Sequence, residues 1–238
     1  IISSKRGTIY DSNGLVLAQS ISVDTVSINP SLVKYSNDKA VEPEKLAQAF
    51  SEIFGITYEE ALEKAKSTKS VEIIAKKVEK EKVTKLQEWM KENNVTTGIN
   101  IDEDTKRYYP NNNLASNLLG FCGDDNTGLS GLEERWDDVL TGTSGKVVTA
   151  KDVDGNAISD ENEQYVPAEN GSNIYLTIDT NIQRIAEKYL AQAVAENQCE
   201  KGGNVIIMNP QTGDILAMAS IPDYNLNSPR EAGPTGLA

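Results

Sequence analysis

Histidine is absent from the sequence, and so are long hydrophobic runs. Without histidine, the chain cannot use Ser-His-Asp or Cys-His catalysis, histidine-based acid–base work or histidine-ligated zinc. No stretch approaches the roughly 18 uncharged apolar residues that a membrane span needs. What remains, with 38% hydrophobic and 25% charged residues in 238, is the composition of a globular protein of one large or two modest domains.

Basic residues and cysteines are also scarce. The 23 Lys and Arg stand against 36 Asp and Glu, which gives a formal net charge of −13. This balance argues against nucleic acid as a partner, because little positive charge is available to displace the counterions of phosphates. Cys122 and Cys199 are the only thiols and lack CxxC spacing, so they build neither a disulfide framework nor a tetrahedral metal site. We expect two small, partly buried side chains, with a disulfide as the alternative.

The first half of the chain alternates between strand-like and helix-like patterns. Two β-type runs in residues 8–18 surround Asn13-Gly14, which tolerates the positive φ angles of a tight turn and so predicts a β-hairpin. The strand-like alternation continues to Ile28. Apolar spacing and capping residues predict further elements. These are helices at 43–54 and 57–65, a strand at 71–78 and an amphipathic helix at 79–93.

Shorter elements follow after residue 94. Short helices are expected at 114–119 and 132–140. A hairpin is expected from 147–150 and the run after Asp154-Gly155, and the polar, acidic segment 159–171 is typical of a linker.

The clearest local pattern lies near the end of the chain. A strand at 174–178 and a helix at 180–197 precede two apolar strands at 205–208 and 215–219. Because these apolar runs do not alternate, we expect both faces of their sheet to be covered. The pattern is typical of the start of an α/β or α+β domain, and the residues after 229 are expected to form a tail or linker.

Two short segments match part of a known functional motif. Ser36-Asn-Asp-Lys39 has the letters of a Ser-x-x-Lys acyl-enzyme motif, in which the lysine acts as base, but its neighbours form loops rather than a helix. Asp152, Asp154, Asn156 and Glu163 fit a calcium loop, except that the glycine of its sharp turn is missing. We interpret the first as a loop and the second as a hairpin turn, so neither a catalytic residue nor a metal site is predicted.

Three phrases combine charged side chains with glycine or proline. They are RGTIYDSNG at 6–14, RYYP at 107–110 and GLSGLE at 128–133. Glycine and proline fix backbone bends, and arginine can fork onto a carboxylate, so the phrases are interpreted as structural. The candidate residues are Arg6, Gly7, Asp11, Gly14, Arg107, Tyr109, Pro110, Gly128, Gly131 and Glu133.

In this order, RGxIxDxxG, RxYP and GxxGxE resemble the non-catalytic signatures of class B penicillin-binding proteins, the peptidoglycan D,D-transpeptidases. The later phrases at 176–183 and 209–222 resemble the opening of that family's transpeptidase domain. The resemblance runs from Arg6 to about Asn227, and the chain is expected to stop before the family's Ser-x-x-Lys, Ser-x-Asn and Lys-Thr-Gly elements. We further predict that Arg6 and Arg107 lie near Glu133 in a partly buried ionic cluster.

The resemblance implies an α+β fold with two parts. Residues 1–170 would form an elongated pedestal of β-hairpins with an inserted helical lobe at 41–100. Residues 171–229 would supply the first strand, helix and strands of an α/β transpeptidase domain, and 230–238 a tail.

The implied function is that of a pedestal, without catalytic residues of its own, in a transpeptidase of cell-wall or spore-wall synthesis. Its partners would be peptidoglycan stem peptides, reached through a catalytic part missing from this chain, a membrane glycan polymerase, and division or sporulation proteins. A single-pass anchor, also missing, would hold it to the extracytoplasmic face of the cytoplasmic membrane, and no cofactor is implied. Two other interpretations stay open: an enzyme active on its own through Ser36 and Lys39, and a stand-alone cell-wall-binding module.

Overall fold

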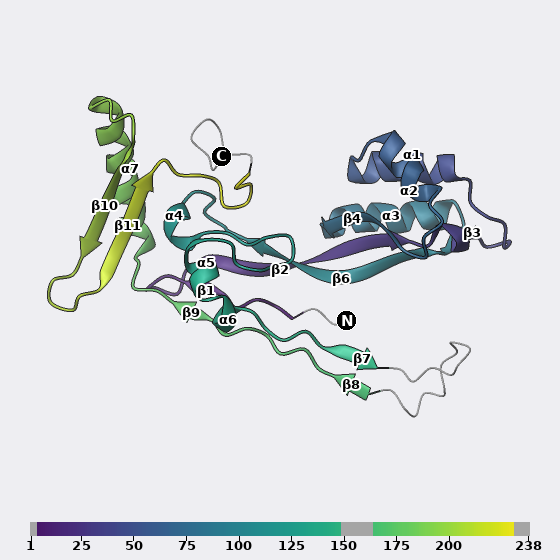
Figure 1. Cartoon of the computed structure of the whole chain (residues 1–238), viewed down its shortest axis with the longest axis horizontal. Coiled ribbons are helices and arrows are strands. Elements are labelled where there is room, and N and C mark those ends of the chain that lie inside the picture. The colour runs from purple at the N-terminus through teal and green to yellow at the C-terminus, as the bar shows by residue number, and fades with distance from the viewer. Residues whose placement is uncertain (1–3, 149–163, 231–238) are drawn as a thin grey trace. The chain divides into compact units, whose positions relative to one another are not determined.

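The computed structural model describes residues 4–148 and 164–230 of the chain (Figure 1). The chain divides into two compact units: Ser22–Lys106, and Ile1–Ile21 together with Arg107–Ala238. Both contain helices and strands, so the predicted α+β class is confirmed. Over the described ranges, none of the helices has the length and apolar character to cross a membrane.

Three α-helices pack with β-strands in the Ser22–Lys106 unit. Strand β2 pairs antiparallel with β4 and also pairs with β6, and β3 pairs antiparallel with β5. The elements are β2 (Val16–Ile28, which begins in the other unit), η1 (Pro30–Leu32), β3 (Lys34–Tyr35), α1 (Pro43–Phe54), α2 (Tyr58–Ala65), β4 (Glu72–Val78), α3 (Lys80–Glu92), β5 (Val95–Thr97) and β6 (Ile99–Tyr108).

Local sequence signals account for the helices of this unit. Helix α1 starts with Pro43, whose fixed φ suits a first helical position, and it ends at Gly55 in the left-handed conformation. The Thr57 side chain caps α2 by accepting a hydrogen bond from the Glu60 N–H at 3.2 Å. The helices predicted at 43–54, 57–65 and 79–93 and the strand predicted at 71–78 are therefore confirmed within a residue or two.

Strand β6 was not predicted, because its sequence lacks the apolar alternation that is typical of a strand. Five of its residues are charged, and Ile99 and Ile101 are its aliphatic residues. A strand with so little apolar alternation is recognised by its pairing with β2 and not by its own pattern.

The other unit is built around the predicted N-terminal hairpin. Strands β1 and β2 pair antiparallel across a turn in which Gly14 has φ +81°, so the hairpin is confirmed, and β9 adds to β1 in parallel. Helix α7 packs on the hairpin of β10 and β11 (Figure 1). The elements are β1 (Ile9–Tyr10), α4 (Ser116–Leu119), α5 (Gly131–Arg135), α6 (Asp137–Leu140), β7 (Lys146–Val148), β8 (Gln164–Val166), β9 (Ile174–Tyr175), α7 (Thr180–Glu196), β10 (Gly203–Met208) and β11 (Ile215–Ile221).

Three sequence predictions for this unit are wrong. The single helix expected at 132–140 is two helices, because Trp136 between α5 and α6 leaves helical geometry. The expected linker contains β8, which pairs with β7; polar composition alone cannot separate an exposed strand from a linker. The sheet of β10 and β11 is not covered on both faces in the described structure, since Ile206 and Met208 are 60% and 53% exposed.

Some predictions lie outside the described residues. They are the calcium-loop residues Asp152, Asp154, Asn156 and Glu163, the turn at Asp154-Gly155 and most of the tail at 230–238.

Candidate functional site

Glu133 is the centre of a buried polar cluster that joins three segments of one unit. It lies on α5, while Arg107 lies near the end of β6 and Arg6 precedes β1. The three residues are 0%, 7% and 5% exposed, respectively. Charged side chains are buried to this extent when they are paired.

Glycines let the backbone around α5 approach closely enough to bury Glu133. Gly131 has φ +59°, and a Cβ there would lie 2.6 Å from the backbone nitrogen of Gly120. At Gly128, a Cβ would lie 2.1 Å from the carbonyl oxygen of Glu133. The GxxGxE spacing therefore places the carboxylate at a crowded crossing that a side chain at either glycine would disturb.

The two oxygens of the Glu133 carboxylate bind different arginines. Arg6 Nε donates to Oε2 and Arg107 Nε donates to Oε1, each at 2.7 Å. Arg6 Nη2 also donates to the backbone carbonyl of Glu133 at 2.6 Å. Charge-assisted hydrogen bonds of this length are the stronger kind, so Glu133 holds Arg6 and Arg107 in fixed positions.

A second carboxylate completes the charge balance. Arg6 Nη1 donates to Asp137 Oδ1 and to Thr141 Oγ1, both at 2.6 Å, and the Gly128 N–H donates to the same Asp137 oxygen at 2.9 Å. Burial alone would raise the pKa of Asp137, but the hydrogen bonds from Gly128 and Arg6 outweigh it and lower the pKa. Two arginines and two carboxylates leave the cluster without net charge.

Arg107 also fixes the backbone before β1. Its Nη1 donates to the Gly7 carbonyl at 2.7 Å, and the Gly7 N–H donates to the Leu140 carbonyl at 2.8 Å. A Cβ at Gly7 would lie 1.9 Å from the Ser172 carbonyl oxygen, so this segment passes where only glycine fits.

Tyr109 and Cys122 enclose the Glu133 carboxylate. The Tyr109 hydroxyl lies 3.4 Å from Oε1, and the Cys122 sulfur lies 3.3 Å from Oε2. Burial, followed by the charge of Glu133, raises the pKa of Tyr109 and raises the pKa of Cys122 to about 12. Both groups therefore stay protonated at neutral pH and can donate to the carboxylate.

Asp11 is fully buried and, apart from this cluster, links the N-terminal hairpin to α7 by hydrogen bonds. Its Oδ1 accepts from the N–H groups of Asn13 and Leu15, and its Oδ2 accepts from the Thr180 hydroxyl at 2.7 Å. Burial alone would raise the pKa of Asp11, but these hydrogen bonds, with Thr180 first among them, lower it.

The structure brings most of the candidate residues together. Arg6, Arg107 and Glu133 meet as expected, with the four residues Gly7, Tyr109, Gly128 and Gly131 around them. Gly14 lies in the turn of the hairpin that Asp11 anchors. Pro110 is exposed and lies outside the hydrogen bonds of the cluster described above.

Sequence reasoning missed Asp137, Thr141 and Cys122. Asp137 follows Glu133 by four residues and Thr141 follows Asp137 by four, a spacing that places side chains on one helical face and could have identified both. No sequence pattern marks Cys122, which was expected to act as a small apolar side chain. The alternative of a disulfide is wrong, because Cys122 and Cys199 are free.

The arrangement can hold segments of the chain together. Ser36 and Lys39 are both exposed in the turn between β3 and α1, not on a helix that would align them. Among the described residues, no group of three or more Cys, Asp or Glu side chains is placed to hold a metal ion.

Comparison with known proteins shows which family the chain resembles. The family model described as the penicillin-binding protein dimerisation domain matches residues 1–176. Peptidoglycan D,D-transpeptidase FtsI of Buchnera aphidicola subsp. Schizaphis graminum is 34% identical over 229 residues, which are 95% of this chain and 39% of that protein. Stage V sporulation protein D of Bacillus subtilis is 33% identical over 224 residues, 93% of this chain and 33% of that protein. The chain thus spans well under half the length of these relatives.

Solved structures share the fold. Penicillin-binding protein 2X from Streptococcus thermophilus matches 100% of this chain and 37% of its own, with a TM-score of 0.64 and 25% identity. Penicillin-binding protein PBP2 of Helicobacter pylori, solved in complex with MreC, matches 95% of this chain and 43% of its own, with a TM-score of 0.66. At 22% identity, the second match shows the fold alone.

Proposed function

We propose, from the premise that the chain belongs to the dimerisation (pedestal) domains of class B penicillin-binding proteins, that residues 1–170 orient the catalytic domain of a peptidoglycan D,D-transpeptidase. In this proposal residues 171–229 begin that catalytic domain, and 41–100 form a lobe inserted in the pedestal. The pedestal sets the orientation of the domain, and it does not itself make or break bonds.

The observation that carries the proposal is the continuous set of contacts from the buried cluster to α7. The Gly171 N–H donates to the Lys5 carbonyl and the Ser172 N–H to the Val139 carbonyl, both at 2.9 Å. A few residues on, the Asp11 carboxylate holds Thr180, the first residue of α7. Because the same short segments also carry Arg6 and Gly7, a movement of the cluster is transmitted to the start of α7.

The exposed face of the β10–β11 sheet supports a larger domain beyond these residues. Ala217 and Ala219 on one face are buried in the cluster of apolar residues with α7, whereas Ile206 and Met208 are exposed. Apolar strands with one bare face are expected where further chain packs.

The reaction is proposed to take place outside the described residues. A serine of the catalytic domain attacks the D-Ala-D-Ala end of a stem peptide, D-Ala leaves, and the acyl group passes to a neighbouring amine. β-Lactams acylate the same serine. A membrane anchor holds the protein at the extracytoplasmic face of the cytoplasmic membrane, and the pedestal contacts membrane partners there, among them a glycan polymerase and division or sporulation proteins. The structure of the Helicobacter PBP2 in complex with MreC supports a partner role for such proteins.

A labelled penicillin tests the proposal. The 238-residue chain should stay unlabelled, while the complete protein encoded by its reading frame should be labelled at a serine outside the chain. Labelling at Ser36 would overturn the proposal. Retention of the chain on purified peptidoglycan, with no labelling of the complete protein, would favour a stand-alone wall-binding module instead.

A further inference from the structure

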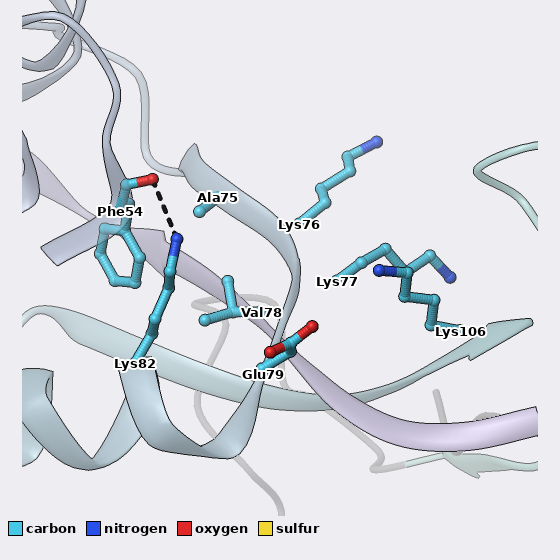
Figure 2. A pocket seen from close by; sticks show the side chains of 8 residues that line it. All are labelled: Phe54, Ala75, Lys76, Lys77, Val78, Glu79, Lys82 and Lys106. Atoms are coloured by element: carbon cyan, nitrogen blue, oxygen red, sulfur yellow. Dashed lines mark hydrogen bonds between the residues drawn. The ribbon is translucent and has the colours of Figure 1, made fainter. Parts of the chain in front are cut away.

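Lysines dominate a pocket of about 310 Å³ in the Ser22–Lys106 unit (Figure 2). Four of the eight lining residues are Lys76, Lys77, Lys82 and Lys106, against Glu79 as the single acid. The volume lies at the lower end of small-ligand sites. In a chain whose net charge is −13, such a concentration of cations around one hollow is unexpected.

A β-bulge allows two adjacent lysines of β4 to line this pocket. The register shifts along β4, so that Lys76 and Lys77 together lie opposite Thr25 of β2. Lys77 has φ +55°, a left-handed conformation that a lysine rarely adopts. Neighbouring residues of a regular strand point to opposite faces, and a bulge re-aims one of them. In Figure 2 the side chains of Lys76, Lys77 and Lys106 extend to the same side of β4.

Among the described residues, three of the four ammonium groups have no carboxylate as a salt-bridge partner. Lys77 Nζ donates to Asp104 Oδ1 at 3.1 Å, and Lys82 Nζ donates to the carbonyl of Phe54, the last residue of α1, at 3.4 Å. Within the described part of the chain, no salt bridge engages Lys76 or Lys106, although the chain is rich in acidic residues.

We propose that this pocket binds a phosphate oxyanion, carried by a small phosphate compound or by the headgroup of an anionic lipid. Lysine presents three N–H donors on a compact charge and is an established ligand for phosphate oxygens. The ammonium groups of Lys76 and Lys106 have no salt-bridge partner among the described residues, so their charge is available to a phosphate. The hydrogen bond to Asp104 holds a third ammonium group, that of Lys77, in place at the pocket. This binding activity is separate from the pedestal role.

Titration of the 238-residue chain with inorganic phosphate at constant ionic strength, followed by amide NMR shifts, tests the proposal. Saturable shifts are expected in β4 and at the start of α3. The variant K76A/K106A should weaken the Kd about tenfold or more, as for the loss of charged hydrogen bonds. The variant K85A/K91A removes the same charge from α3 outside the pocket and should leave the Kd unchanged, and K76R/K106R should bind like the wild type.

Vesicles separate the two sources of phosphate. Binding to phosphatidylglycerol but not to phosphatidylcholine vesicles, lost in K76A/K106A, identifies a lipid headgroup; saturable binding of inorganic phosphate without vesicle binding identifies a small compound. The absence of saturable binding to both probes, or an equal loss in K76A/K106A and K85A/K91A, would overturn the proposal. Circular dichroism of each variant confirms that the fold is retained.

Discussion

Replacing Glu133 with alanine should destabilise the protein by about 3–5 kcal/mol, the usual cost of removing one partner of a buried ion pair. The side chains of Arg6 and Arg107 are 3% and 4% exposed and cannot turn to water without unpacking. Arg6 keeps Asp137, but Arg107 loses its carboxylate partner. The loss is a large part of a typical total stability of about 5–15 kcal/mol.

Urea denaturation followed by circular dichroism measures this loss. Glu134→Ala, at the exposed neighbouring position, is the matched control and should change the stability by less than about 0.5 kcal/mol. In the double variant R107A/E133A the two losses should not add, because the unpaired cation is removed with the carboxylate. A loss below about 1 kcal/mol for Glu133→Ala would refute the reasoning, because it would place the pair in the range of solvent-exposed ion pairs.

Three further predictions concern backbone, pH and thiols. Gly128→Ala should cost more stability than Gly14→Ala in urea denaturation, because a Cβ at Gly128 meets a carbonyl oxygen at 2.1 Å whereas Gly14 has open space around it. Asp11 has a lowered folded pKa, so its stabilisation is full above the unfolded pKa of about 3.9 and is lost as the pH falls through the folded value. Asp11→Asn should therefore destabilise the protein at pH 7, and the difference from wild type should shrink below about pH 4; an equal difference at both pH values would contradict this. A thiol reagent at neutral pH should modify exposed Cys199 in the native protein and Cys122 only after unfolding, because the Cys122 pKa is raised to about 12.

The sequence predicted those helices and hairpins that are determined by nearby residues, such as capping and turn residues. Helix α1 follows from Pro43, its apolar spacing and Gly55, and the first hairpin follows from Asn13-Gly14. Strand β6 could not be predicted in this way, because hydrogen bonding to β2, not its own alternation, makes it a strand. The exposure of one face of the β10–β11 sheet could not be predicted either, because an apolar run in a sequence does not show which elements cover it.

The centre of the candidate site was predictable from the sequence, and its periphery was predictable only in part. Arg6, Arg107 and Glu133 stand in phrases where glycine or proline flanks a charge, so a buried arginine–carboxylate contact could be predicted. Asp137 has the four-residue spacing from Glu133 that could have indicated it, but it lies after a break in the helix that the sequence did not reveal. Cys122 comes from a loop whose path depends on the packing around it.

We propose that the buried cluster orients a catalytic domain without taking part in its chemistry. The most direct measurement compares Glu133→Gln with the wild type in the complete protein, by the rate of acylation with labelled penicillin and by the fraction of cross-linked stem peptides in the cell wall. We expect unchanged acylation with reduced cross-linking. Wild-type cross-linking, or acylation lost together with cross-linking in a protein that is still folded, would contradict it.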